Sequence, residues 1–231
     1  MLVGRHKTTD NSDINIIEEG KKKKLDLKTS IKILGVHVDQ ELNWNKQVAE
    51  VNKKARYSSR KLQRVNHLLP LKSKLLLYNS LVATHFNYAD TVWGGLSQQN
   101  KNKLQRTQNS IAKSILGMKN RESSESALRK ANLLTLDMKR KVHEAVYTHK
   151  ALSGKLPEAI TERYKQHTSR NNFRSADKQI LTVPKHSKES FKRSPIYRTI
   201  QVWNSVPAEM KKAETSTFKR NYQAYLQSLK H

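Results

Sequence analysis

The chain of 231 residues contains no cysteine, only 5 prolines and 7 glycines, and few aromatic side chains. Without cysteine, a disulfide framework, a zinc knuckle and a thiol nucleophile are all excluded. No stretch approaches about 18 consecutive apolar residues, and the N-terminus has no apolar run typical of a signal peptide. We therefore expect a protein of the nucleus or the cytoplasm.

Acidic residues are also scarce relative to basic ones. The 19 Asp and Glu residues are outnumbered by 45 Lys and Arg, which gives a formal net charge of +26. The isoelectric point is near 10.2 and the mean hydropathy is −0.81. This excess indicates an anionic partner, and nucleic acid is favoured because each neutralised phosphate releases counterions. An acidic membrane surface and a merely solubilising coat are the alternatives.

The first 40 residues have a β pattern. Short apolar runs at 1–3, 14–17 and 31–38, the last rich in β-branched side chains, with turns at Gly4 and Gly20, predict a small and incomplete sheet. Residues 21–24 are four consecutive lysines. They are typical of a nuclear import signal or of a solvated hairpin edge, and we favour the hairpin edge.

The pattern becomes helical after Leu42. Apolar residues at steps of three and four over 48–69 predict one amphipathic helix that ends before Pro70. Four basic residues fall on its opposite face at the same steps: Lys53, Arg56, Arg60 and Arg64. A solvated charged face is the alternative to a phosphate-binding one. We favour binding because this face carries four cations and no acid.

Further helices are predicted along the rest of the chain. The segment 75–86 is apolar nearly all round, which predicts a central buried helix. The polar and basic composition after about residue 167 predicts a long basic connection. The other expected helices cover 98–116, 123–130, 136–152, a short segment opened by Pro157, 192–206 and 216–230.

Six short landmarks occur in a fixed order along the chain. They are Ile33-Leu34-Gly35-Val36, Leu42-Asn43-Trp44, Asn87-Tyr88-Ala89-Asp90, Val92-Trp93-Gly94, Leu116-Gly117 and Trp203-Asn204-Ser205-Val206-Pro207. Together they resemble the C-terminal part of the reverse transcriptase of non-LTR retrotransposons, the jockey-like mobile elements. The resemblance extends from about residue 31 to the end of the chain.

The resemblance implies roles for individual segments. Residues 33–36 resemble the strand of the primer grip, in which Leu34 and Gly35 hold the end of the growing strand, since a residue without Cβ lets a bound strand approach closely. Residues 39–44 resemble the start of the thumb. The helix over 48–69 resembles the first thumb helix, whose basic face would meet the phosphates of the template–primer duplex.

The resemblance also implies what this chain lacks. Tyr88-Ala89-Asp90 resembles the start of the polymerase's aromatic-Ala-Asp-Asp signature, which needs two adjacent aspartates to hold two metal ions. Thr91 follows here, and the motif lies downstream of the primer-grip match. We therefore expect no catalytic residue, no metal site and no cofactor in this chain. Mg²⁺ is implied only for the intact polymerase, and the chain alone is expected to be inactive.

Other candidate chemistry is weak. His143, Glu144 and His149 mimic a zinc protease motif, but helical ligands need spacing i, i+4 and these histidines are six residues apart. Asp10 and Asp13 are expected to be solvated.

Aromatic residues near basic ones in the last forty residues are candidates for stacking on unpaired bases or for a core: Tyr197, Trp203, Tyr222 and Tyr225. We assign Trp203 to the core and leave Tyr222 and Tyr225 open.

The sequence therefore predicts a mostly α fold: a helical thumb-like bundle, a small N-terminal β element and a basic helical C-terminal region. The expected divisions are a remnant palm and primer-grip element (1–41), a thumb-like domain (42–121) and a basic C-terminal domain (122–231) with a loop near 167–190.

The expected function is that of a nucleic-acid-binding fragment of an RNA-directed DNA polymerase, which positions template and primer through phosphate contacts. The expected partners are RNA, DNA or RNA–DNA hybrid, together with the missing N-terminal polymerase portion, and no membrane. The alternative is a pseudogene product or a domesticated basic interaction protein without a polymerase role.

Overall fold

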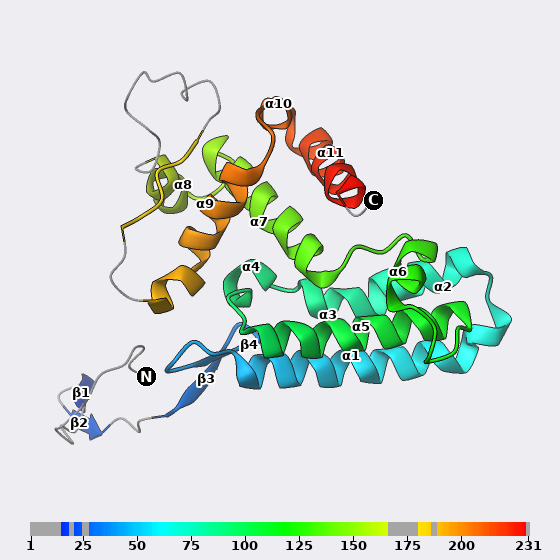
Figure 1. Cartoon of the computed structure of the whole chain (residues 1–231). Coiled ribbons are helices and arrows are strands. Elements are labelled where there is room, and N and C mark those ends of the chain that lie inside the picture. Colours follow the sequence, from blue (N-terminus) through cyan, green and yellow to red (C-terminus); the bar gives the residue numbers. More distant parts are fainter. Residues whose placement is uncertain (1–14, 19–20, 25–27, 166–179, 186–188, 230–231) are drawn as a thin grey trace. The chain divides into compact units, whose positions relative to one another are not determined.

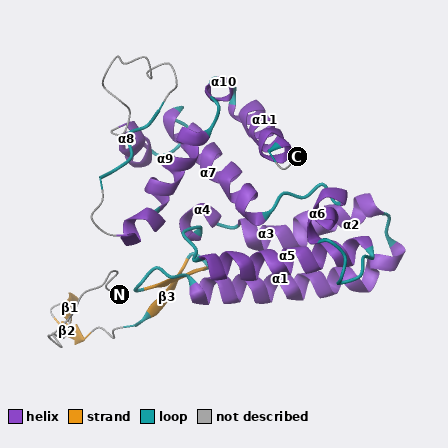
Figure 2. Ribbon diagram, viewed as in Figure 1, coloured by secondary structure: helices purple, strands orange, loops and turns teal. Residues whose placement is uncertain are grey.

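The computed structural model describes residues 15–18, 21–24, 28–165, 180–185 and 189–229. These residues are mostly helical, as predicted, and two small β-hairpins precede the first long helix (Figures 1 and 2). The expected strand at 1–3 lies outside the described residues, as do Gly4, Gly20, Asp10 and Asp13. The chain divides into two compact units, residues 1–50 and 51–231, and each is described by itself.

Two antiparallel hairpins characterise the first unit. Strand β1 (Asn15–Glu18) pairs with β2 (Lys21–Lys24), so the run of lysines forms a hairpin strand, as favoured from the sequence. Strand β3 (Ser30–Ile33) pairs with β4 (Val36–Asp39), with Ile33 opposite Val36. Residues Leu34 and Gly35 have φ values of 45° and 84°, which is the geometry of a two-residue hairpin turn. The expected strand across 33–36 is therefore wrong, because the chain reverses at its centre.

The segment that follows is a tight turn held by one carboxylate. Asp39 accepts hydrogen bonds from the backbone N–H groups of Asn43 (2.9 Å) and Trp44 (2.8 Å). Leu42 and Trp44 adopt positive φ values of 52° and 63°, so this conformation needs such fixed contacts. Trp44 is buried, and helix α1 (Asn45–Val65) begins directly after it. The Leu-Asn-Trp landmark therefore forms the turn from which helix α1 begins.

Helices make up the first half of the second unit. After α1 come a 3₁₀ turn η1 (Asn66–Leu68), α2 (Leu71–Leu77), a π-helical turn η2 (Tyr78–Val82), α3 (Ala83–Asn87), α4 (Asp90–Trp93), α5 (Gln98–Leu116) and α6 (Ser124–Lys130). Helix α5 matches its predicted bounds. The Ser97 hydroxyl accepts a hydrogen bond from the Asn100 N–H at its start, and Gly117, at φ 68°, ends it.

The helical run from α2 to α3 is not a central buried helix. Leu71, Leu76 and Leu81 expose 43%, 69% and 42% of their surfaces, and only the face that carries Tyr78 and Val82 is buried. The sequence predicted burial of every face because hydrophobic side chains occur all around this segment. Its outer face has no neighbour within the described residues of this unit, and the π-helical turn shifts the residues that follow around the helix axis.

The second half of the unit consists of α7 (Leu136–Leu152), α8 (Glu158–Lys165), a 3₁₀ turn η4 (Glu189–Arg193), α9 (Pro195–Ser205), α10 (Ala208–Lys211) and α11 (Thr215–Ser228). Helix α7 has its predicted bounds, and α9 and α11 lie against it (Figure 1). The short helices α4 and α10 were not predicted. The division of the chain at 41 and 121 stays a prediction.

An aromatic column forms the core between α7, α9 and α11. Phe218 stacks on His149 at a ring-centroid distance of 4.8 Å and on Tyr222 at 5.9 Å. Trp203 and Tyr222 are each only 1% exposed. Trp203 is therefore a core residue, as predicted, and Tyr222 belongs to the core as well. Tyr225 is half-buried beside it.

The last sequence landmark also has a structural basis. Beside the buried Trp203, the Asn204 side chain accepts a hydrogen bond from the Leu181 N–H and donates one to the Leu181 carbonyl, both at 2.9 Å. This double contact satisfies the backbone of a segment far from α9 in sequence. Among the described residues, no helix combines the length and apolar composition that a bilayer crossing requires.

Replacing Trp203 tests the assignment of the core. We expect Trp203→Ala to lower the free energy of unfolding by about 3–5 kcal/mol, because it leaves a cavity among the rings of His149 and Phe218. Urea denaturation followed by circular dichroism measures this loss. Gln201→Ala, at an exposed position of the same helix, should change stability by less than about 0.5 kcal/mol. Equal losses for the two variants would contradict the assignment.

Lys211 is buried beside this core, and its charge opposes folding. Lys211 is 5% exposed, its Nζ lies 5.0 Å from the centre of the Trp203 ring, and desolvation lowers its pKa from 10.5 to about 8. Between these two pH values the unfolded chain holds this proton more tightly than the folded one. Stability contributed by this group therefore rises with pH across that window.

We expect Lys211→Met to be more stable than the wild type at pH 7, and this advantage to shrink by on the order of 1–2 kcal/mol by pH 10. The comparison cancels the titration of groups that both proteins share. Urea titrations of both proteins at intervals of pH give the difference. A stability difference that stays constant from pH 7 to pH 10 would contradict the low pKa of Lys211.

Candidate nucleic-acid interface

The outer side of helix α1 carries a row of cations, as the sequence predicted. We call Lys53, Arg56, Arg60 and Arg64 the α1 basic face. All four side chains are exposed. At a rise of 1.5 Å per residue the row extends over roughly 16 Å of the helix. This length matches several successive phosphates of a nucleic-acid strand.

The opposite side of α1 is buried and fixed by hydrogen bonds. The buried residues from 51 onward are Val51, Asn52, Ala55, Ser59 and Leu62. The Thr107 hydroxyl of α5 donates a hydrogen bond to the Asn52 carboxamide oxygen. Ser58 hydrogen-bonds the His85 imidazole at 3.0 Å. Val65 was predicted to lie on the apolar side but is 38% exposed. The direction of the buried side rotates slowly around a helix, so that at the end of α1 it no longer includes Val65.

Two more contacts hold the end of the helix against α5. The Gln63 amide donates to the Ser114 hydroxyl at 3.0 Å, and the Asn66 amide donates to the Ser114 carbonyl at 3.2 Å. Polar side chains therefore hold α1 at several successive turns. The α1 basic face is thus presented by a rigid helix.

The charges of the α1 basic face are not neutralised by neighbouring acids. Helix α1 carries seven cations and one acid, Glu50. Within the described part of the chain, no ion pair involves Lys53, Arg56, Arg60 or Arg64. Burial and the nearby Lys54 lower the pKa of His85, which favours a neutral imidazole under this helix. The face is therefore available to an external anion.

Leu34 and Gly35 are not part of this face. They belong to the first unit, at the turn between β3 and β4, where Leu34 is 87% exposed. The positive φ of Gly35 explains glycine at this position, without any close approach of a bound strand. The structure brings the four cations together on one helix of the second unit, and the two turn residues belong to the first unit.

The Val-Trp-Gly landmark is a packing motif. The Trp93 ring is fully buried, and its N–H donates to the Tyr88 carbonyl at 2.8 Å. A Cβ on Gly94 would lie 2.5 Å from Cδ of Arg140 and 2.6 Å from the Asp90 carbonyl oxygen. A side chain at Gly95 would meet the Arg193 backbone at a still shorter distance. Both glycines are required because an arginine and a carbonyl occupy the space.

One arginine joins two distant segments to the turn that precedes its own helix. The Arg198 guanidinium donates to a Glu144 carboxylate oxygen at 2.8 and 3.0 Å, to the Thr91 carbonyl at 2.7 Å and to the Arg193 carbonyl at 2.6 Å. Burial raises the pKa of Glu144, an effect that Arg198 partly offsets. This pair was not predicted from the sequence, because no local pattern relates residues 54 positions apart.

The residues of the rejected catalytic and zinc motifs have structural contacts. Asp90 is buried and its carboxylate lies 2.6 Å from Nδ1 of His143. His149 donates from Nε2 to the Ala213 carbonyl at 2.9 Å, and burial lowers its pKa. Glu144 pairs with Arg198. In the part of the chain that is described, no group of three His, Asp or Glu side chains could hold a metal ion.

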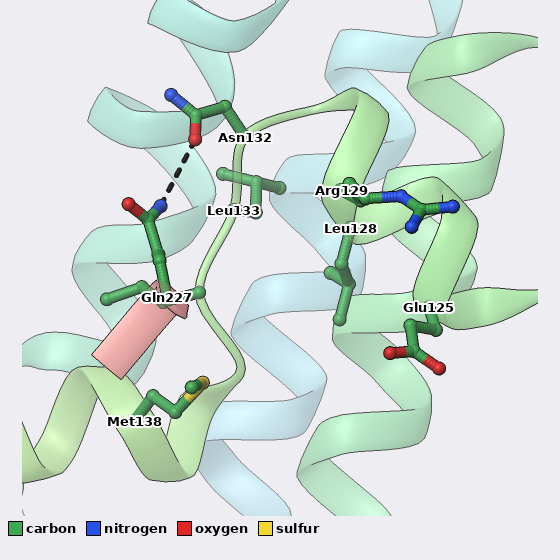
Figure 3. Close-up of a pocket in the computed structure, with 8 residues that line it drawn as sticks. Glu125, Leu128, Arg129, Asn132, Leu133, Met138 and Gln227 are labelled. Atoms are coloured by element: carbon green, nitrogen blue, oxygen red, sulfur yellow. Dashed lines mark hydrogen bonds between the residues drawn. The ribbon is translucent and has the colours of Figure 1, made fainter. Parts of the chain in front are cut away.

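A shallow hollow lies between α6, the loop before α7 and α11 (Figure 3). Its volume is about 230 Å³, and Leu128, Leu133 and Met138 supply much of its lining. The Gln227 amide donates to the Asn132 side-chain oxygen at 3.1 Å across it. Its lining also includes Glu125 and Arg129, whose opposite charges leave it without the net positive charge that favours a phosphate.

Comparison with protein-family models, with curated proteins and with solved structures finds no match to this chain.

Replacing Arg198 tests its joining role. We expect Arg198→Met to lower the free energy of unfolding by about 3–5 kcal/mol, because Glu144 would remain buried without its partner. Chemical denaturation of both proteins measures the loss. Arg193→Met removes an exposed cation five residues away and should change stability by less than about 0.5 kcal/mol. A stable Arg198→Met protein would show that the segments hold together without this contact.

Proposed function

We propose that the chain binds RNA, or an RNA–DNA hybrid, through phosphate contacts made by the α1 basic face. The observation that carries the proposal is a row of four exposed cations, unpaired among the described residues, on a helix fixed from behind. Phosphates spaced along a strand are met by Lys and Arg at regular intervals. A helix that does not move loses little freedom when it binds.

The expected binding is independent of base sequence. Cations that meet backbone phosphates set affinity and register but read no base. Trp203 and Tyr222, near the C-terminus, do not supply base stacking from an open surface, because both are core residues. Tyr57 is 60% exposed on α1, but Lys61 lies over its ring at 4.7 Å. Charge therefore dominates the proposed interaction.

The landmark order supports a more specific role. By its resemblance to non-LTR retrotransposon reverse transcriptases, the helix α1 would be the thumb helix that lies along the template–primer duplex. The chain would then position template and primer for an RNA-directed DNA polymerase and act in the nucleus or the cytoplasm. The metal-binding aspartates of such a polymerase have no match in this sequence. Polymerase catalysis would therefore require another polypeptide segment that supplies these aspartates.

Charge reversal on the α1 basic face tests the proposal. We expect Arg56→Glu with Arg60→Glu to weaken hybrid-duplex binding at least tenfold and to reduce the slope of log affinity against log salt by about 2, since two phosphate contacts are lost. Fluorescence anisotropy with a labelled duplex, measured across a salt series, gives both quantities.

A matched control separates local contact from overall charge. Lys150→Glu with Arg163→Glu changes the net charge equally at exposed positions on α7 and α8. This variant should lose much less affinity and keep the wild-type salt slope. If both double variants lose the same affinity, the face has no special role, and the positive charge acts as a diffuse coat.

A further inference from the structure

A second basic feature lies on helix α7, away from the α1 basic face. Arg140 is only 6% exposed, and its Nε is fully buried without a hydrogen-bond partner. Its guanidinium carbon lies 5.7 Å from the centre of the Trp93 ring. Among the described residues no hydrogen bond or ion pair reaches this guanidinium. An arginine keeps its charge in proteins, so a buried guanidinium with an unpaired Nε–H is costly to the fold.

The nearby carboxylates are committed to other partners. Asp137 pairs with Lys101 at 3.2 Å and with Lys141 at 3.4 Å. The Glu144 carboxylate forms an ion pair with the Arg198 guanidinium at 2.8 Å. Asp90, whose carboxylate lies 2.6 Å from Nδ1 of His143, lowers the cost of the Arg140 charge through space most, followed by Glu144 and Asp137, but none of them accepts a hydrogen bond from its guanidinium.

The Arg140 side chain lines a cavity of about 200 Å³ between α5, α7 and α9. Four cations and two carboxylates surround it: Lys101, Arg140, Lys141 and Arg198, with Asp137 and Glu144. Gly94 forms part of the wall, and a Cβ there would collide with the stem of Arg140. The lining therefore combines a formal net positive charge with a buried arginine that has no hydrogen-bond partner among the described residues.

We propose that this cavity binds one phosphate group, held by the Arg140 guanidinium with Lys101 and Lys141 at its rim. A planar guanidinium matches two oxygens of a phosphate, and a buried one binds it with little competition from water. The phosphate could belong to a nucleic-acid strand or to a free phosphate compound. The inference does not depend on the α1 basic face, which lies on another helix.

The test uses the full chain and inorganic phosphate at constant ionic strength, with chloride as the reference anion. Isothermal titration calorimetry of the wild type should show one saturable site. Arg140→Met should abolish it, and Lys101→Gln should weaken it several-fold. Lys103→Gln, exposed on the same helix as Lys101, should leave it unchanged. Arg140→Met should also fold normally, because methionine makes no demand for hydrogen bonds at this position.

The outcomes are distinguishable. A wild type that responds to phosphate no more than to chloride would overturn the proposal. So would equal phosphate binding by the wild type and Arg140→Met or, should that variant not fold, by the wild type and Lys101→Gln. If Arg140→Met also weakens hybrid-duplex binding, the phosphate is that of a strand. If duplex binding is unchanged while the phosphate site is lost, the ligand is a free phosphate compound. The variant with Arg56 and Arg60 reversed should retain the site whatever its duplex affinity.

Discussion

The second unit depends on one guanidinium. Arg198 donates hydrogen bonds to Glu144 of α7, to the Thr91 carbonyl of α4 and to the Arg193 carbonyl before α9, and so joins segments up to 107 residues apart. This contact also explains the two glycines at 94 and 95, since a side chain at either would collide with an arginine or with backbone. The glycines of the Val-Trp-Gly landmark are therefore needed to leave room for the arginine of the buried Glu144–Arg198 ion pair. The aromatic core of α7, α9 and α11 involves the same two helices, α7 and α9.

Local rules explain what the sequence predicted well. Helices α5 and α7 have the expected bounds because serine and threonine caps, a C-terminal glycine and a clear helical period agree with one another. The hairpin turn at Leu34 and Gly35 was missed because a β-branched run on both sides reads as one strand. The prediction that segment 75–86 is buried all round was wrong, because hydrophobic composition does not determine which faces of a helix have packing neighbours. The Glu144–Arg198 pair, Arg140 and the cavity it lines depend on contacts between distant residues, which no single-sequence period contains.

The net charge of +26 is distributed between two kinds of position. Some cations are used inside the fold: Arg198 joins helices, and Lys101 and Lys141 share Asp137. Others, on the α1 basic face, have no acidic partner among the described residues and point to solvent from a helix that hydrogen bonds hold in place. A solubilising coat needs no such rigid support. The contrast supports the binding role proposed for this face, whose proposed ligand, from the landmark order, is a template–primer duplex.

The central claim is that a specific helix face tracks phosphates. The most direct measurement is the affinity of the folded chain for hybrid, DNA and RNA duplexes across a salt series, with helix content checked by circular dichroism. Four phosphate contacts predict a slope of log affinity against log salt of about −3.5 or steeper, with the hybrid bound most tightly. Weak binding with a shallow slope by a fully folded sample would contradict the claim and would leave the positive charge as a solvated coat.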